Sequence, residues 1–119
     1  MAAPNLLNLT TITAGQAVAN LTTSATALIT NAAASGKSIK VNSVIVGNVD
    51  GTNAATFDLY ITRSATNYYI SKVVNVPAAS SLIAISKDAS FYLLEGDVLS
   101  ALASAASDLD ISVAYETLE

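Results

Sequence analysis

The sequence offers few residues suited to chemistry, and two of them are acids that flank a glycine, Glu95-Gly96-Asp97. Paired carboxylates can serve as the acid and base of a glycosidase or as oxygen ligands for calcium. A glycine turn with solvated acids is the simpler interpretation. Asp50 to Asn53 and Asp108 to Asp110 offer further oxygen ligands, but neither follows the spacing of an EF-hand loop. We therefore assign no metal and no cofactor, and leave open a calcium site assembled from several loops.

Nucleophilic catalysis lacks its usual partners in this chain, which contains no histidine and no cysteine. A serine or threonine hydroxyl needs an oriented base beside it, and histidine is the commonest one. Ser86 and Lys87 are neighbours in sequence, and neighbours on a strand point to opposite faces. A carboxylate-based hydrolase would need two acids facing each other across a cleft. We expect a protein that is not an enzyme.

Aromatic side chains are a further candidate for binding, because tyrosines can stack on sugars. Such residues more often fill a core edge or a subunit interface, and we favour that interpretation. The five tyrosines are Tyr60, Tyr68, Tyr69, Tyr92 and Tyr115.

The elements that would position these residues show an alternation of apolar and polar residues with a period of two, which is typical of strands. In the stretch from Thr56 to Thr62 the outward residues are Thr56, Asp58 and Thr62, and the inward ones are Phe57, Leu59 and Ile61. In the last strand Asp110 and Glu116 point outward with Ser112 and Ala114, and the inward residues are Leu109, Ile111, Val113 and Tyr115.

The stretch from Ser38 to Val49 is a longer, β-branched strand. Alternation places Val44 and Val46 on the polar face with Ser38, Lys40, Asn42 and Asn48, and the opposite face carries Ile39, Val41, Ile45 and Val49. Gly47 predicts a bulge or bend within it.

Turn residues separate these runs at near-even intervals. Asp50-Gly51-Thr52-Asn53 predicts a hairpin connection, because Gly and Asn tolerate positive φ. Leu21 to Ala34 has a spacing that a helix could use, but its four threonines favour a strand. Further strands are expected at 68–76, 82–86, 91–94 and 98–103. The chain is predicted to be all-β, a single antiparallel β-sandwich, jelly-roll-like, with about eight or nine short strands.

Charge and hydropathy exclude several partners. The five basic residues are scattered and the net charge is −4, which predicts no direct nucleic-acid binding. No apolar stretch is long enough to span a bilayer, so no membrane association is expected. The beginning of the chain has no basic segment, so we expect no secretory signal and synthesis in a cytoplasm.

No charged residue occurs from Met1 through Gly36, and all fourteen lie in the remainder. One explanation is that the strands of this third lie inside the domain's own sheets. The other is that residues 1–13 form an extended N-terminal arm, or a first strand, ordered against another protein, with a sandwich domain at 14–119. Neutral surface suits the core of a protein contact. The predicted contact residues are Pro4, Asn5, Leu6, Leu7 and Leu9.

The C-terminal half resembles small virion structural proteins of tailed bacteriophages, particularly cyanophages. The similarity lies in the run from Ser86 to Leu99 and in the closing Ser112-Val113-Ala114-Tyr115-Glu116. The opening from Met1 to Thr10 and the turn from Asn48 to Ala55 are similar to the same group. These motifs are structural, and no catalytic residue is implied by them.

The resemblance implies a virion component, most closely a capsid decoration (cement) protein that binds and stabilises the assembled head shell. Its expected partners are the major capsid protein or other virion proteins, and its expected state is a homotrimer. A tail, fibre or receptor-binding component, in which tyrosines and loops bind a host surface, is the alternative.

Overall fold

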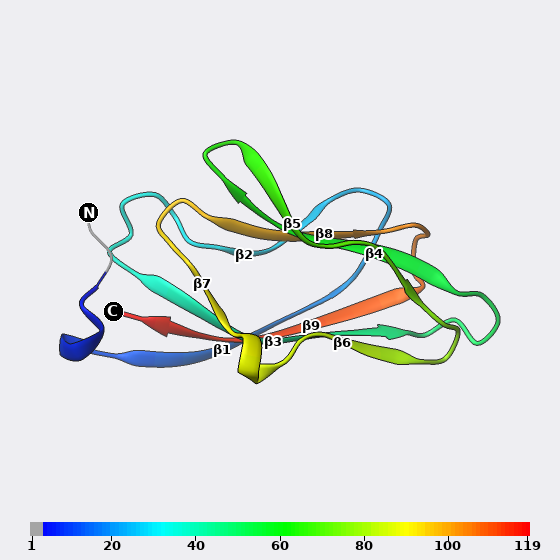
Figure 1. The fold of residues 1–119 in the computed structure, drawn as a ribbon, viewed down its shortest axis with the longest axis horizontal. Helices are drawn as coiled ribbons and strands as arrows, with labels where there is room; N and C mark the ends of the chain where they lie inside the picture. The colour runs from blue at the N-terminus through cyan, green and yellow to red at the C-terminus, as the bar shows by residue number, and fades with distance from the viewer. Residues whose placement is uncertain (1–3) are drawn as a thin grey trace.

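The computed structural model describes residues 4–119, and their strands form two antiparallel sheets that pack face to face (Figure 1). Sheet A contains β1 (Ile12–Asn20), β3 (Ser38–Asn48), β6 (Ser81–Ile85), β7 (Phe91–Leu93) and β9 (Leu109–Leu118). Sheet B contains β2 (Thr26–Thr30), β4 (Ala55–Arg63), β5 (Thr66–Val76) and β8 (Val98–Ala103). Two short 3-10 turns complete the structure, η1 (Leu6–Asn8) and η2 (Lys87–Ala89). The predicted β-sandwich is confirmed.

The topology is that of one long hairpin rolled into a barrel-like sandwich. β4 and β5 form its tip, joined by the two-residue turn Ser64-Ala65. Outward from this tip β3 pairs with β6 and β7, β2 pairs with β8, and β1 pairs with β9. Rolling places the strands in the orders β1-β9-β3-β6 and β2-β8-β4-β5, a jelly-roll arrangement. The rolled body measures 49 × 26 × 19 Å.

The core lies between the sheets and is built from the inward residues that alternation predicts. Phe57 and Leu59 on β4 are buried, and Ile61 is half-buried near the hairpin tip. On β9 the buried residues are Leu109, Ile111 and Val113, with Tyr115 half-buried against the same core. The inward side of both strands is therefore confirmed.

The predicted faces of β3 are correct only for its first half. Ile39 and Val41 are buried, but Val44 and Val46 are buried as well, while Ile45 is exposed. Val49, just beyond the strand, is also exposed. The pairing of β3 with β9 shifts between Val41 and Ser43, so one extra residue reverses the alternation. The bulge expected at Gly47 lies at Asn42 instead, and Gly47 pairs regularly with Asp110.

The segment Asp50 to Asn53 does not close a hairpin, because β3 and β4 belong to different sheets. It carries the chain across the end of the sandwich. Asn48 anchors this crossing: it is buried, and its Nδ2 donates to the carbonyls of Asn53 and Val76, both at 3.0 Å. The side chain of Asp50 accepts from the Thr52 amide and closes the local turn.

The strand predicted over Leu21–Ala34 is present but covers only Thr26–Thr30. Leu21 is buried and its amide donates to the Leu109 carbonyl at 2.8 Å, so the chain turns inward before β2 begins. Asn31 is buried after β2 and donates to the carbonyls of Lys37 and Leu93. At the N-terminus, β1 begins at Ile12, two residues before the domain boundary that we predicted. Within residues 4–119, no helix has the length and apolar character that crossing a membrane requires.

Candidate functional site

The predicted N-terminal contact segment, described from Pro4 onward, presents apolar side chains at one end of the sandwich; Met1 to Ala3 of the predicted arm lie outside the described residues. Leu7 is 91% exposed and Leu6 is 52% exposed, while Pro4 and Leu9 are half-buried. The side chain of Asn5 accepts from the Leu7 amide at 2.9 Å and caps η1. This cap holds the two leucines on a defined turn.

The base of this segment is attached to the C-terminus, which lies at the same end of the molecule (Figure 1). The amides of Thr10 and Thr11 donate to the carbonyl of Glu119 at 2.7 and 2.8 Å. In return, the Glu119 amide donates to the Thr11 carbonyl at 3.1 Å. The Glu119 carboxylate also pairs with Lys37 at 3.2 Å. The leucines therefore project from a base that is tied to the sandwich.

A second apolar surface lies on the outer face of sheet A. Val18, Ser112, Ile45 and Ile83 are cross-strand neighbours and form a row over β1, β9, β3 and β6. Val18 is 72% exposed, and Ile83 and Ile45 are also exposed. We call this set the sheet A row. The alternation placed Ser112 on this face but Ile45 on the opposite one, because the bulge at Asn42 is not visible in the pattern.

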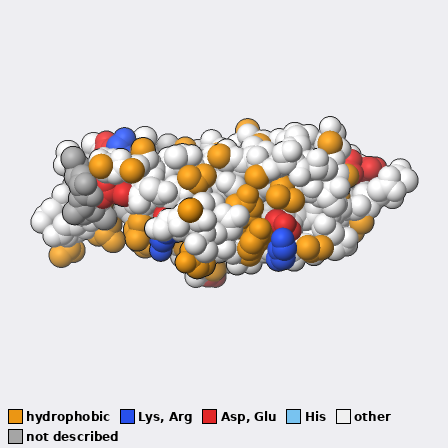
Figure 2. Space-filling view, turned by 90° about the horizontal axis from the view of Figure 1, so that it is seen from above, with side chains coloured by type: hydrophobic (Ala, Val, Ile, Leu, Met, Phe, Trp, Pro, Cys, Tyr) orange, Lys and Arg blue, Asp and Glu red, His pale blue; other side chains and the backbone are white. Residues whose placement is uncertain are grey.

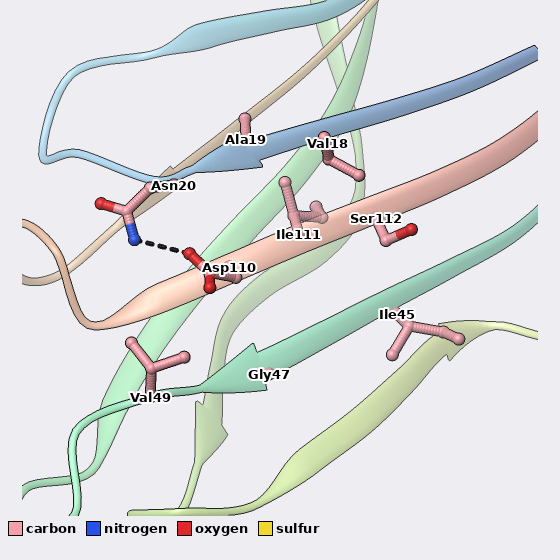
Figure 3. Close-up of a pocket in the computed structure, with 9 residues that line it drawn as sticks. All are labelled: Val18, Ala19, Asn20, Ile45, Gly47, Val49, Asp110, Ile111 and Ser112. Carbon is pink, nitrogen blue, oxygen red and sulfur yellow. Dashed lines mark hydrogen bonds between the residues drawn. The ribbon is translucent and has the colours of Figure 1, made fainter.

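An open depression of about 640 Å³ is lined in part by Val18, Ser112 and Ile45 of the sheet A row (Figure 3). Its floor includes Gly47, where an added Cβ would meet no atom within 4 Å. Val49 stands on one side, and Asn20 and Asp110 stand on the other, joined by a hydrogen bond of 2.6 Å from Nδ2 to Oδ1. The depression is shallow and apolar with one polar border, so it provides surface for a contact but no set of groups for chemistry.

The two acids that flank Gly96 hold loops together. Asp97 was expected to be solvated, but its side chain is only 2% exposed. It accepts from Arg63 Nε at 2.8 Å, from the second guanidinium nitrogen, and from the Leu94 amide. Burial alone would raise the pKa of Asp97, but these bonds and the charge of Arg63 lower it below its usual value. The Glu95 carboxylate accepts from the Gly36 amide at 3.0 Å.

Asp58 also differs from its predicted place. It lies on the outer side of β4 but is buried, because β5 bulges over it. Its carboxylate accepts from the Val73 amide at 2.8 Å and from Lys72 Nζ at 3.1 Å. The hydrogen bond to Asp58 raises the pKa of Lys72. This acid therefore fixes the irregular shape of the β5 edge.

The tyrosines do not gather into one platform. Tyr60, on β4, is buried, and its ring centroid lies 5.0 Å from that of Tyr69 on β5. Lys72 Nζ lies 4.3 Å from the centroid of the Tyr69 ring. Tyr68 is exposed near the hairpin tip, Tyr92 is exposed on β7 in sheet A, and Tyr115 borders the core. Figure 2, viewed from the sheet B side, shows small apolar groups scattered among neutral ones, with few charges.

The oxygen-rich loops are likewise built for structure. The amides of Thr52 and Asn53 donate to the Asp50 carboxylate and lower its pKa. Across residues 4–119, no group of three or more potential acidic, histidine or cysteine ligands is arranged to hold a metal ion.

Comparison with known proteins shows likeness in the fold. No family model matches the chain, and no curated protein matches its sequence. Among solved structures, one described as "Bacillus endospore appendages form a novel family of disulfide-linked pili" is similar, with a TM-score of 0.51 and 14% identity. The match covers 99% of this chain and 96% of the other. The jelly-roll sandwich is thus one used by a structural pilus protein.

Proposed function

We propose that this protein is a structural component of a phage virion, a capsid decoration protein that binds the assembled head shell and stabilises it. The observation that carries this proposal is the pair of exposed leucines on the capped turn η1, with Leu7 at 91% exposure. Apolar side chains on a fixed turn lose little conformational freedom when they bind, which favours a protein contact.

The rest of the molecule supports a structural role. The described ion pairs and buried amides fasten loops to the sandwich, and the fold resembles that of a pilus protein. That relative is described as disulfide-linked, whereas this chain has no cysteine. Its contacts with neighbours therefore involve no disulfide from this chain, and many copies on one shell would gain avidity from multivalency. The homotrimer implied by the phage resemblance stays a prediction.

The proposal is tested by cosedimentation with heads assembled from the major capsid protein of the same phage. Leu7→Asp should weaken attachment by about tenfold or more, because it places a charge in an apolar contact. Ile83→Asp changes an exposed apolar residue of another face and serves as the matched control. Unchanged attachment of the Leu7 variant, or equal loss in both variants, contradicts a contact through η1.

A tail or receptor-binding role is the second candidate, and the exposed Tyr68 beside Tyr69 at the β4–β5 hairpin favours it. Aromatic rings at an exposed tip suit stacking against a sugar. A glycan-binding screen of the intact protein distinguishes the two roles. A ligand whose binding is lost in Tyr68→Ala while shell attachment is absent would favour the tail role.

A further inference from the structure

We propose that β1 is an open sheet edge that pairs antiparallel with β1 of a second copy, joining the two A sheets into one continuous sheet. β1 is the outermost strand of sheet A (Figure 1). Along one of its two edges, β1 pairs with β9 through nine consecutive residue pairs. Within residues 4–119, none of the backbone hydrogen bonds made outside the paired strands involves β1. The amides and carbonyls on the edge of β1 that faces away from β9 therefore form a row that another strand can bind.

The other sheet edges carry features that discourage such pairing. β2 has five residues and a shift in register. β5 has two shifts, the charged residue Lys72, and Val73 in the left-handed region with φ of 51°. The opposite edge of sheet A is split between β6 and β7, with η2 between them. Charges, bulges and short strands are the means by which proteins protect their edges.

β1 has none of these features. Its sequence Ile-Thr-Ala-Gly-Gln-Ala-Val-Ala-Asn contains no charge and no proline, and its pairing with β9 has no irregularity. The polar side chains on its outer face turn toward β9: Gln16 Nε2 donates to Ser112 Oγ at 2.9 Å, and Asn20 Nδ2 donates to Asp110. They leave the free edge uncovered. A nine-residue neutral edge is long enough to give a paired interface its main-chain hydrogen bonds.

The partner strand that we infer for β1 is β1 of a second copy. Edge pairing needs an open edge on both partners, and every copy of this chain supplies one in β1. The chain carries a net charge of −4, yet β1 places no acid at the contact, so two copies meet without repulsion there. The nearest outward acids on β9 are Asp110, bound to Asn20, and Glu116, bound to Asn42. An isologous contact of this kind has twofold symmetry.

The register that pairs all nine residues places the twofold axis at Gln16. Ala14 then lies opposite Val18 of the second copy, and the exposed Ile12 lies opposite Asn20 of the second copy. The residues around the axis are small, so the two β1 strands can approach each other closely. The two sheet A rows would continue across the joined strands, so the exposed Val18 gains a neighbour without any rearrangement of the monomer.

The test is the mass of the full-length protein by light scattering over a range of concentrations, for wild type and for Gln16→Lys and Gln16→Glu. Each variant brings two like charges together at the axis and should raise the dissociation constant by about tenfold or more. An equimolar mixture of the two variants should restore association, because Lys then faces Glu. Ile83→Lys, on the same face but at the opposite edge of sheet A from β1, is the control and should leave the mass unchanged.

The wild-type assembly should contain an even number of chains. That number is two if β1 pairing acts alone, or six if the predicted homotrimer also forms. A monomer, a trimer, or variants that keep the wild-type mass would overturn β1 pairing. Amide hydrogen exchange provides a readout without any variant: protection of β1 should rise with protein concentration while that of β5 does not. The inference is independent of shell attachment, which the Leu7 variant tests separately.

Discussion

The ring of Tyr115 lies over Gly15, its cross-strand neighbour on β1, so closely that a Cβ on Gly15 would lie 2.4 Å from Cζ of the ring. Gly15→Ala must displace the ring from the core edge, and we expect a loss of about 1–3 kcal/mol in the free energy of unfolding. Urea titration measures it. Gly47→Ala, where the added atom meets open space, should change stability by less than about 0.5 kcal/mol.

A double-mutant cycle assigns this effect to the ring. In a Tyr115→Leu background the Gly15→Ala penalty should largely disappear, because the group that occupied the space is gone. An equal penalty in both backgrounds would mean that the backbone of β1, and not the contact with Tyr115, excludes the side chain.

Alternate residues of β9 should differ sharply in their effect on stability. Ile111 is buried between the sheets, and Ile111→Ala should cost about 2–5 kcal/mol. Asp110 is exposed with one hydrogen bond to Asn20, so Asp110→Ala should cost about 1 kcal/mol or less. Thermal and chemical unfolding of both variants gives the comparison, and equal losses would contradict the assigned faces. Leu59 on β4 is buried in the same core, so Leu59→Ala should cost as much as Ile111→Ala.

The Arg63 and Asp97 pair predicts a specific pH dependence. Because the folded-state pKa of Asp97 is lowered, the unfolded state binds the proton more readily, and this contribution to stability is complete above about pH 4 and lost as the pH falls below it. Arg63→Met leaves a buried carboxylate without its cation and should cost about 3 kcal/mol at pH 7. In this variant burial raises the pKa of Asp97, so protonation relieves the penalty.

The stability gap between wild type and Arg63→Met should therefore be widest near neutrality and should narrow as the pH falls through 4. Urea unfolding at several pH values measures the gap. Lys37→Met removes a cation from an exposed pair with Glu119 and is a suitable control with little expected loss. A gap for Arg63→Met that stays constant with pH would exclude the Asp97 charge as its cause.

Val73 carries backbone strain that substitution should relieve. It is a β-branched residue at φ of 51°, a region in which such residues are rare, and its side chain is exposed. Val73→Asn and Val73→Gly should raise the free energy of unfolding by about 1 kcal/mol. Its amide bond to Asp58 is preserved in both. A loss of stability in both variants, by thermal unfolding, would show that the Val73 side chain contributes more than its conformation costs.

Alternation of apolar and polar residues was enough to predict the sandwich. It also predicted the inward sides of β4 and β9, because each of these strands turns one face toward the core. It failed on β3, where one extra residue near Asn42 exchanges the faces. A bulge leaves no compositional mark when the residues on both sides are β-branched. The exposed Ile45 and the depression beside it were missed for this reason.

The other differences between the sequence-based prediction and the structure concern polar residues. Asp58, Asp97 and Asn48 occupy positions typical of solvated turns and faces, yet all three are buried. Their partners are distant in sequence: Arg63 is 34 residues from Asp97, and the Val76 carbonyl is 28 residues from Asn48. Such pairings depend on how the hairpin rolls, which local patterns do not encode. The contact segment from Pro4 to Leu9 was predicted from its lack of charge and stays a prediction; Leu6 and Leu7 are exposed, whereas Leu9 is half-buried.

The rolled hairpin also bears on how the chain is made. β9 lies between β1 and β3 and is formed by residues 109–118, which follow those of every other strand in the described part of the chain. Until that strand leaves the ribosome, β1 has no neighbour in sheet A, whereas the β4–β5 hairpin can close early from residues near in sequence. The nascent chain therefore carries an unpaired, neutral β1 until residues 109–118 have been synthesised. The order of synthesis sets a period in which crowding of ribosomes on one message would favour pairing between unfinished chains.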